Sequence, residues 1–268
     1  MKTSRRTFVK ALIGAGAVAT TPPVARLMAA WAAQSHTPHG NKQRRWVMVI
    51  DLAECDGCKK CTAACQREHF VPFEQEWIKV LEMSNNEYEI YHFPRPCMQC
   101  ENAPCVKVCP VAATYHNEEG IVLVDHNKCI GCRFCMAACP YGVRSFNWTE
   151  PSHSPREQFI QYSPEYPVPH RKGTVEKCMF CAHRVTMGRL PTCVEACAAA
   201  EMWAIYFGDA NENLVTNGKE VVKLTDLLAK GHGYQYKEEL GTHPRVYYLL
   251  PKRGAAKSSR REQDEAKG

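Results

Sequence analysis

Residues 129–140 read CIGCRFCMAACP and space four cysteines as Cys-x2-Cys-x2-Cys-x3-Cys-Pro. Such a run is typical of cubane iron–sulfur sites, in which three thiolates bind one cluster and the fourth binds a second. The two-residue gaps let three sulfur atoms converge on neighbouring corners of one small object. Pro140 ends any helix after Cys139 and fixes the backbone there, which directs Cys139 toward another site. The stretch therefore predicts one half of a two-cluster unit.

The chain has 268 residues, and its sixteen cysteines all fall into four groups of four. Disulfide frameworks scatter their cysteines, and a zinc ion normally takes two Cys-x2-Cys pairs. Triplets followed by a fourth cysteine and a proline fit neither pattern, although groups one and four lack the proline. In chain order the groups are Cys55, Cys58, Cys61, Cys65; Cys97, Cys100, Cys105, Cys109; Cys129, Cys132, Cys135, Cys139; and Cys178, Cys181, Cys193, Cys197.

The cysteine groups form an internal repeat in the order A-B-A-B. Residues 50–65 and 124–139 share the pattern D-x3-C-x-G-C-x2-C-x-A-A-C, and CMFC and CVEAC of group four echo CMQC and CVKVC of group two. A short interval with a strand-like run at 121–124 separates groups two and three, which favours a hairpin. Groups two and three are therefore expected to pair with each other, which leaves groups one and four as partners.

Four [4Fe-4S] clusters follow when each takes three cysteines from one group and one from its partner group. No catalytic residue is predicted, because the sequence has no Cys-x2-Cys-His haem site, no GxGxxG after a strand and no P-loop. The predicted ligand sets are site 1 (Cys55, Cys58, Cys61, Cys197), site 2 (Cys65, Cys178, Cys181, Cys193), site 3 (Cys97, Cys100, Cys105, Cys139) and site 4 (Cys109, Cys129, Cys132, Cys135).

The predicted fold is α+β, with one two-cluster ferredoxin-like module nested in another. The inner module spans 95–140, and the outer module spans 34–94 and 170–250. Residues 141–169 are expected to be a surface insertion or, with equal weight, a docking surface for a partner. The tail, 251–268, is expected to be disordered. Strands are predicted at 46–50, 77–81, 88–93, 203–207 and 245–250, and a helix near 219–230.

Residues 1–33 are predicted to be a twin-arginine export signal. Paired Arg5 and Arg6 precede a short apolar run at 11–20 and small residues around Ala32. A membrane anchor helix needs about 20 apolar residues, and Thr-Thr-Pro-Pro at 20–23 interrupts the run, so no transmembrane helix is expected. The twin-arginine pathway carries folded proteins, which suits clusters assembled before export. A periplasmic location on the outer face of the cytoplasmic membrane is therefore expected.

The net charge of +6 comes largely from the leader and from KRGAAKSSRR at 252–261. No basic patch with interleaved aromatic residues is present, so nucleic acid is not an expected partner. Arg144 and Lys177 adjoin cysteine groups, where each could tune a cluster or could equally be a solvated charge. The scattered histidines are expected to be surface or core residues: His69, His92, His116, His126 and His183.

Four blocks carry a family resemblance: RPCMQCENAPCVKVCPVAATY (95–115), GIVLVDHNKCIGCRFCMAACPYGVRSFN (120–147), VEKCMFCAHR (175–184) and PTCVEAC (191–197). With them the chain resembles the four-cluster electron-transfer subunits of complex iron–sulfur molybdoenzymes, the dimethyl sulfoxide reductase family. The block CPYGVRSFNW and the long interval before group four look most like the exported iron–sulfur subunit of the sulfite-reduction-associated membrane complex.

This resemblance implies the same pairing of cysteine groups and a relay of single electrons. One implied partner is a multi-pass, quinone-reactive membrane subunit, facing site 4. The other is a molybdopterin catalytic subunit or a multihaem cytochrome c, facing site 1. The alternative is a free-standing, soluble periplasmic polyferredoxin. A catalytic role is less favoured, because cysteine is expected to complete the ligation of every cluster.

Overall fold

The computed structural model describes residues 44–84, 88 and 90–252. The predicted leader therefore lies outside the described residues, as does the predicted tail beyond residue 252. The chain divides into two units, Met1–Gln43 and Arg44–Gly268, and every described element belongs to the second. Within the described residues, no helix has both the length and the apolar character needed to cross a membrane.

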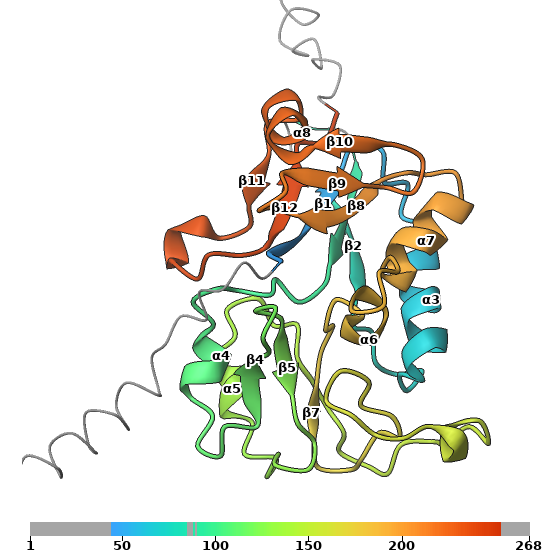
Figure 1. Cartoon of the computed structure of the whole chain (residues 1–268), viewed down its shortest axis with the longest axis vertical. Coiled ribbons are helices and arrows are strands. Elements are labelled where there is room, and N and C mark those ends of the chain that lie inside the picture. The colour runs from blue at the N-terminus through green and yellow to red at the C-terminus, as the bar shows by residue number, and fades with distance from the viewer. Residues whose placement is uncertain (1–43, 85–87, 89, 253–268) are drawn as a thin grey trace, which may run out of the picture. The chain divides into compact units, whose positions relative to one another are not determined.

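A six-stranded sheet lies at one end of the described unit (Figure 1), with the strand order β10-β9-β8-β1-β12-β11. Its central strand, β1 (Trp46–Asp51), pairs in parallel with β12 (Val246–Leu249) and antiparallel with β8 (Ile205–Asp209). The other strands are β9 (Leu214–Thr216), β10 (Val221–Lys223) and β11 (Tyr234–Gln235).

Strand β1 is buried on both faces of the sheet, because successive side chains of a strand point to opposite sides. Met48 and Ile50 belong to the main hydrophobic core, which also contains most of the cysteines. Val47 and Val49 belong to a smaller cluster on the other face, which is covered by Leu224 of α8 (Leu224–Lys230). The sheet thus supplies one wall of the region that holds the thiols.

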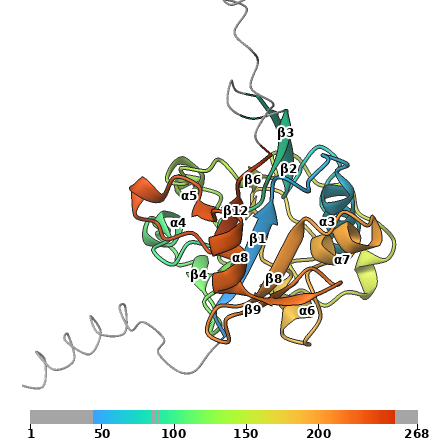
Figure 2. The ribbon, with the colours of Figure 1, turned by 90° about the horizontal axis from the view of Figure 1, so that it is seen from above.

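Two helices, α3 (Lys60–His69) and α7 (Thr192–Ala199), pack together below one end of the sheet. On the opposite side lie the short helices α4 (Pro104–Lys107) and α5 (Phe134–Ala137), as Figures 1 and 2 both show. Among the described residues, the remaining helical elements are α6 (Ala182–Val185) and two 3-10 turns, η1 (Glu157–Phe159) and η2 (Glu238–Leu240).

Three two-stranded pairs complete the part of the fold that the structure describes. Strands β4 (Thr114–His116) and β5 (Val122–Val124) form the hairpin predicted between groups two and three. Strands β2 (Lys79–Met83) and β3 (Tyr91–Arg95) form a second antiparallel pair. Strand β6 (Ser145–Phe146) pairs with β7 (Val175–Glu176), so the two ends of the long third interval lie side by side. The mixture of helices and strands confirms the predicted α+β class.

The helix predicted near 219–230 is wrong over its first part. Val221 and Val222 belong to strand β10, opposite Thr216 and Val215 of β9, and the helix begins only at Leu224. Two adjacent β-branched residues favour a pleated, half-buried surface, and pairing with β9 provides one. The predicted helix is correct at Leu224, Leu227 and Leu228, which lie in α8. Leu227 and Leu228 pack against the smaller hydrophobic cluster.

Candidate metal centres

All sixteen cysteines have free thiols, and Cys58 is the one classed as exposed. In the part of the chain that the structure describes, no three His, Cys, Asp or Glu side chains have the arrangement expected around a single metal ion. Eight of the thiols lie instead around two larger spaces, four around each.

One cavity, of about 280 Å³, is lined by all four cysteines of site 2. Helix α3 contributes Cys65, the turn before α6 contributes Cys178 and Cys181, and α7 contributes Cys193. Its other walls are mainly apolar and include Met48, Ile78 and Phe180. Burial raises the pKa of the Cys65 thiol, and the thiols of Cys178 and Cys181 raise it further. Groups one and four therefore meet in one space.

A second cavity, of about 320 Å³, is lined by all four cysteines of site 3. Three of them come from group two, and Cys139 comes from group three. Pro140 lines the same cavity, so the proline after the fourth cysteine helps to shape the space into which that cysteine projects. In each of these cavities, four thiols surround a space with largely apolar walls. This is the donor set that a cubane cluster takes from a protein.

The thiols of site 1 are electrostatic neighbours. The pKa of Cys55 is raised to about 11, mainly by burial, and the thiols of Cys197 and Cys58 contribute to the rise. The pKa of Cys61 is raised to about 12, again mainly by burial, with contributions from Cys55 and Cys197. The structure thus brings Cys197 of group four next to the first three cysteines of group one.

In site 4, burial raises the pKa of Cys135, and the thiols of Cys129 and Cys109 also raise it. Cys109 of group two therefore lies beside group three, and Cys132 belongs to the same loop as Cys129 and Cys135. Gly131 in this loop has φ +69°, and a Cβ there would lie 2.4 Å from the carbonyl oxygen of Gly173. A neighbouring chain segment, as well as the turn itself, thus requires glycine at this position.

Thiols of different sites are also neighbours, which relates the sites to one another. The thiol of Cys61, in site 1, raises the pKa of Cys65, in site 2, which lies one turn away on α3. Cys97 of site 3 is the thiol that most raises the pKa of Cys178 of site 2, after burial. Cys105 of site 3 likewise acts on Cys135 of site 4. These three electrostatic interactions relate the sites in the order 1, 2, 3, 4.

Two thiols have a nitrogen atom within hydrogen-bonding distance. The amide of Thr114 donates to Cys109 Sγ at 3.5 Å, and Nε2 of His69 lies 3.1 Å from Cys181 Sγ. Donors of this kind stabilise thiolate and make a bound cluster easier to reduce. The sequence interpretation missed His69, although the i, i+4 spacing of Cys61, Cys65 and His69 places all three on one helix face.

Arg144 and Lys177 are both buried, so the alternative prediction that they are solvated charges is wrong for both. Burial raises the pKa of the Cys105 thiol, whereas the positive charges of Arg144 and Lys177 lower it. Arg144 also lowers the pKa of Cys135 across the gap between sites 3 and 4. Both cations therefore face thiols.

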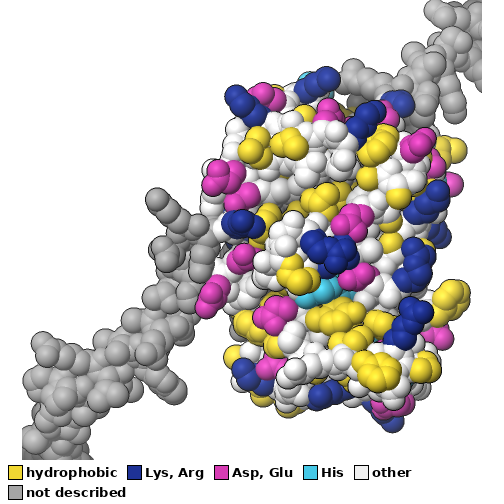
Figure 3. Space-filling model, turned by 45° about the vertical axis from the view of Figure 1, so that its right-hand side comes forward, with side chains coloured by type: hydrophobic (Ala, Val, Ile, Leu, Met, Phe, Trp, Pro, Cys, Tyr) yellow, Lys and Arg dark blue, Asp and Glu magenta, His cyan; other side chains and the backbone are white. Residues whose placement is uncertain are grey.

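The loop of site 4 carries exposed apolar side chains. Ile130 and Phe134 alternate with the ligands of this loop, and they are 64% and 60% exposed. Trp148 is 65% exposed and lies under the Arg133 guanidinium, 4.5 Å from its ring centre. On the face shown in Figure 3, by contrast, basic and acidic side chains are interspersed among the apolar ones. An apolar surface next to thiols is suited to contact with another protein.

Comparison with known proteins gives a consistent picture. Two family models, each described as a 4Fe-4S dicluster domain, match residues 31–113 and residues 88–155 with 158–210. The chain is 42% identical over 221 residues to the B subunit of selenate reductase from Mesobacillus selenatarsenatis, covering 76% of this chain and 72% of that protein. It is 39% identical over 237 residues to the menaquinone reductase iron–sulfur cluster-binding subunit of Nitratidesulfovibrio vulgaris, covering 76% and 88%.

A third relative, the B subunit of tetrathionate reductase from Salmonella typhimurium, is 31% identical over 262 residues, covering 93% of this chain and 89% of that protein. The matched dicluster domains and the grouped thiols identify [4Fe-4S] clusters as the cofactor.

Proposed function

We propose that this chain, which belongs to the iron–sulfur electron-transfer subunits of respiratory reductase complexes, relays electrons through four [4Fe-4S] clusters. Each cluster would carry one electron at a time. The observation that carries the proposal is the pair of cavities, each lined by four cysteines from two paired groups. The electrostatic interactions between thiols of neighbouring sites support the order 1, 2, 3, 4 for the relay.

The same observations support the predicted ligand sets. We assign Cys55, Cys58, Cys61 and Cys197 to site 1, with Cys65, Cys178, Cys181 and Cys193 to site 2. Site 3 takes Cys97, Cys100, Cys105 and Cys139, and site 4 takes Cys109, Cys129, Cys132 and Cys135. Sites 3 and 4 draw on the middle of the chain, whereas sites 1 and 2 draw on segments from both sides of it. An inner module nested in an outer one accounts for this pattern.

The two ends of the relay differ in their surfaces. Site 4 lies beneath exposed Ile130 and Phe134, which suits contact with an apolar membrane subunit that reacts with quinone. Site 1 includes the exposed thiol of Cys58, with exposed Asp56 before it and exposed Lys59 and Lys60 after it. This end suits a redox partner with a polar surface, such as a molybdopterin subunit or a multihaem cytochrome c. A free-standing shuttle is less favoured, because the relatives are named as subunits of reductases.

The leader supports a location outside the cytoplasm. Its paired arginines, Arg5 and Arg6, match a signal that exports folded proteins. The chain would then dock on the outer face of the cytoplasmic membrane, with clusters already in place.

A Phe134→Glu variant tests docking and location together. A charge in an apolar interface opposes association, so the variant is expected to leave the membrane and appear in the periplasmic fraction with its iron intact. Wild-type protein should stay with the membrane and be digested by protease added to spheroplasts. Val221→Glu, at a residue 67% exposed on the edge strand β10, is the matched control and should stay membrane-bound. Wild-type protein recovered entirely as a soluble species would favour the shuttle instead.

A further inference from the structure

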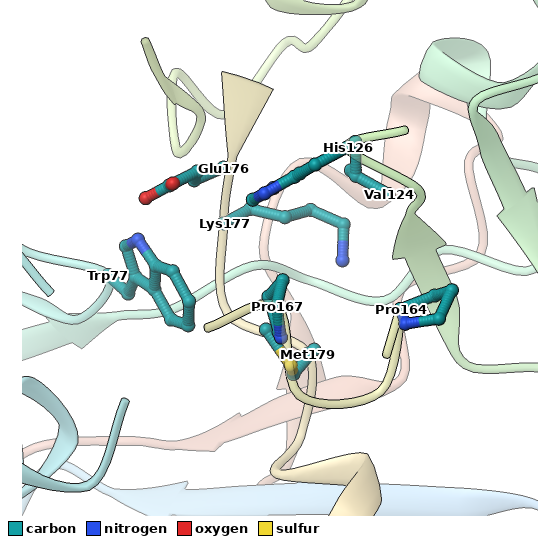
Figure 4. Close-up of a pocket in the computed structure, with 8 residues that line it drawn as sticks. All are labelled: Trp77, Val124, His126, Pro164, Pro167, Glu176, Lys177 and Met179. Carbon is teal, nitrogen blue, oxygen red and sulfur yellow. The ribbon is translucent and has the colours of Figure 1, made fainter. Parts of the chain in front are cut away.

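Lys177 occupies the junction between sites 2 and 3. It follows strand β7 directly and precedes Cys178, and only 2% of its surface is exposed. Its ammonium donates to the carbonyl oxygen of Cys178 at 2.9 Å and to that of Val122 in β5. Figure 4 shows the side chain extending from its own strand toward β5. The charged end is therefore held by one acceptor beside site 2 and another on the hairpin between cysteine groups two and three.

The neighbouring carboxylate does not neutralise this charge. Glu176 points to the opposite side of the strand, toward Trp77 (Figure 4). Its Oε1 accepts a hydrogen bond from Asn147 Nδ2 at 2.6 Å and lies 2.6 Å from His170 Nδ1. The two residues whose carbonyl oxygens bind the ammonium line the spaces of two sites, Val122 that of site 3 and Cys178 that of site 2. Burial and the Arg144 guanidinium lower the pKa of Lys177, whereas Cys97, Cys178 and Cys105 raise it. The positive charge is thus held between the ligands of two sites.

Gln99 spans the same junction without a charge. Its amide nitrogen donates to the Cys178 carbonyl at 2.8 Å, and its amide oxygen accepts from the Val122 amide at 2.8 Å. Lys177 and Gln99 therefore contact the same two residues, and both side chains are buried. Because one of these side chains is charged and the other is neutral, variants of the two can separate the effect of charge from the effect of hydrogen bonding.

We propose that Lys177 is a positioning residue whose fixed charge raises the reduction potentials at both site 2 and site 3, so that both clusters are easier to reduce. This inference rests on the proposed relay. One-electron reduction adds one negative charge and makes or breaks no covalent bond, and a nearby buried cation stabilises the added charge. The buried guanidinium of Arg144 acts on site 3 in the same sense from the side of site 4.

The test is a redox titration of the purified, cluster-loaded protein followed by EPR. Lys177→Met removes the charge at similar volume. It should lower the reduction potentials of sites 2 and 3 by about 59 mV or more. For a one-electron centre, this shift is a tenfold change in the oxidised-to-reduced ratio at a given potential. Site 1 should keep its potential. The signals are assigned by their loss in Cys193→Ser for site 2 and Cys100→Ser for site 3.

Two variants serve as controls. Lys172→Met removes an exposed lysine five positions earlier, and Gln99→Leu removes the neutral bridge; neither should shift the potentials as Lys177→Met does. If Lys177→Met loses iron, Lys177→Gln, which keeps a donor for the Cys178 carbonyl, is titrated instead. Unchanged potentials in an iron-replete Lys177 variant, or an equal shift in Lys172→Met, would overturn the proposal. The relay itself would fail differently, through missing clusters in the wild-type protein.

Discussion

A Cys139→Ser variant is expected to lose the cluster at site 3 and to keep the one at site 4. Cys139 belongs by sequence to the run of Cys129, Cys132 and Cys135, yet it lines the cavity formed by group two. Serine is a poor iron ligand compared with thiolate, so the iron content should fall by as much as one cubane, about four irons. EPR of the reduced protein should show one altered signal.

The reciprocal variant, Cys109→Ser, makes the result specific. Cys109 belongs by sequence to group two, but its thiol acts on Cys135 of group three. It should therefore disturb site 4 and spare site 3. The crossed assignment is wrong if Cys139→Ser disturbs the cluster on Cys129, Cys132 and Cys135 while site 3 remains intact.

Removal of iron is expected to unfold the chain. The thiols of sites 2 and 3 line spaces that lie in or against the main core. Because an unfolded chain has no preformed site, the binding free energy of a structural metal is folding free energy, about 10–16 kcal/mol for zinc in small peptides. A domain is stable by only about 5–15 kcal/mol in total. Metal binding is therefore a large part of the folding free energy, as in other small metalloproteins.

Circular dichroism under anaerobic conditions checks this expectation. After iron is extracted with a chelator and reductant, the near-ultraviolet signal and the cooperative thermal transition should both disappear. Protein carried through the same steps without chelator is the control, and it should melt as before. An iron-free chain that keeps a native spectrum and a cooperative transition would show that the sheet and helices hold the fold without the clusters.

Much of the site could be predicted from spacing alone. The triplets of cysteines, the hairpin between groups two and three and the strand at 46–50 all follow from local patterns, and the structure contains the hairpin and the strand. The start of the last helix could not be predicted, because Val221 and Val222 are strand only through pairing with β9. Such pairing depends on a partner that periodicity does not identify.

The residues that surround the sites could not be predicted from the sequence, for a similar reason. Arg144 and Lys177 stand next to cysteines in the chain, but only the fold decides that both are buried and face thiols. The amide of Gln99 reaches Cys178 across 79 residues of sequence. His69 is the exception, since its helical spacing from Cys65 could have indicated its place beside site 2.

The most direct test of the relay is the number of clusters in one chain. Iron and acid-labile sulfide should be measured on anaerobically purified protein, together with low-temperature EPR of the reduced state. Four [4Fe-4S] clusters predict about sixteen irons and as many sulfides per chain, with spectra that show interaction between neighbouring centres. About eight irons, or isolated signals from two centres, would contradict the account.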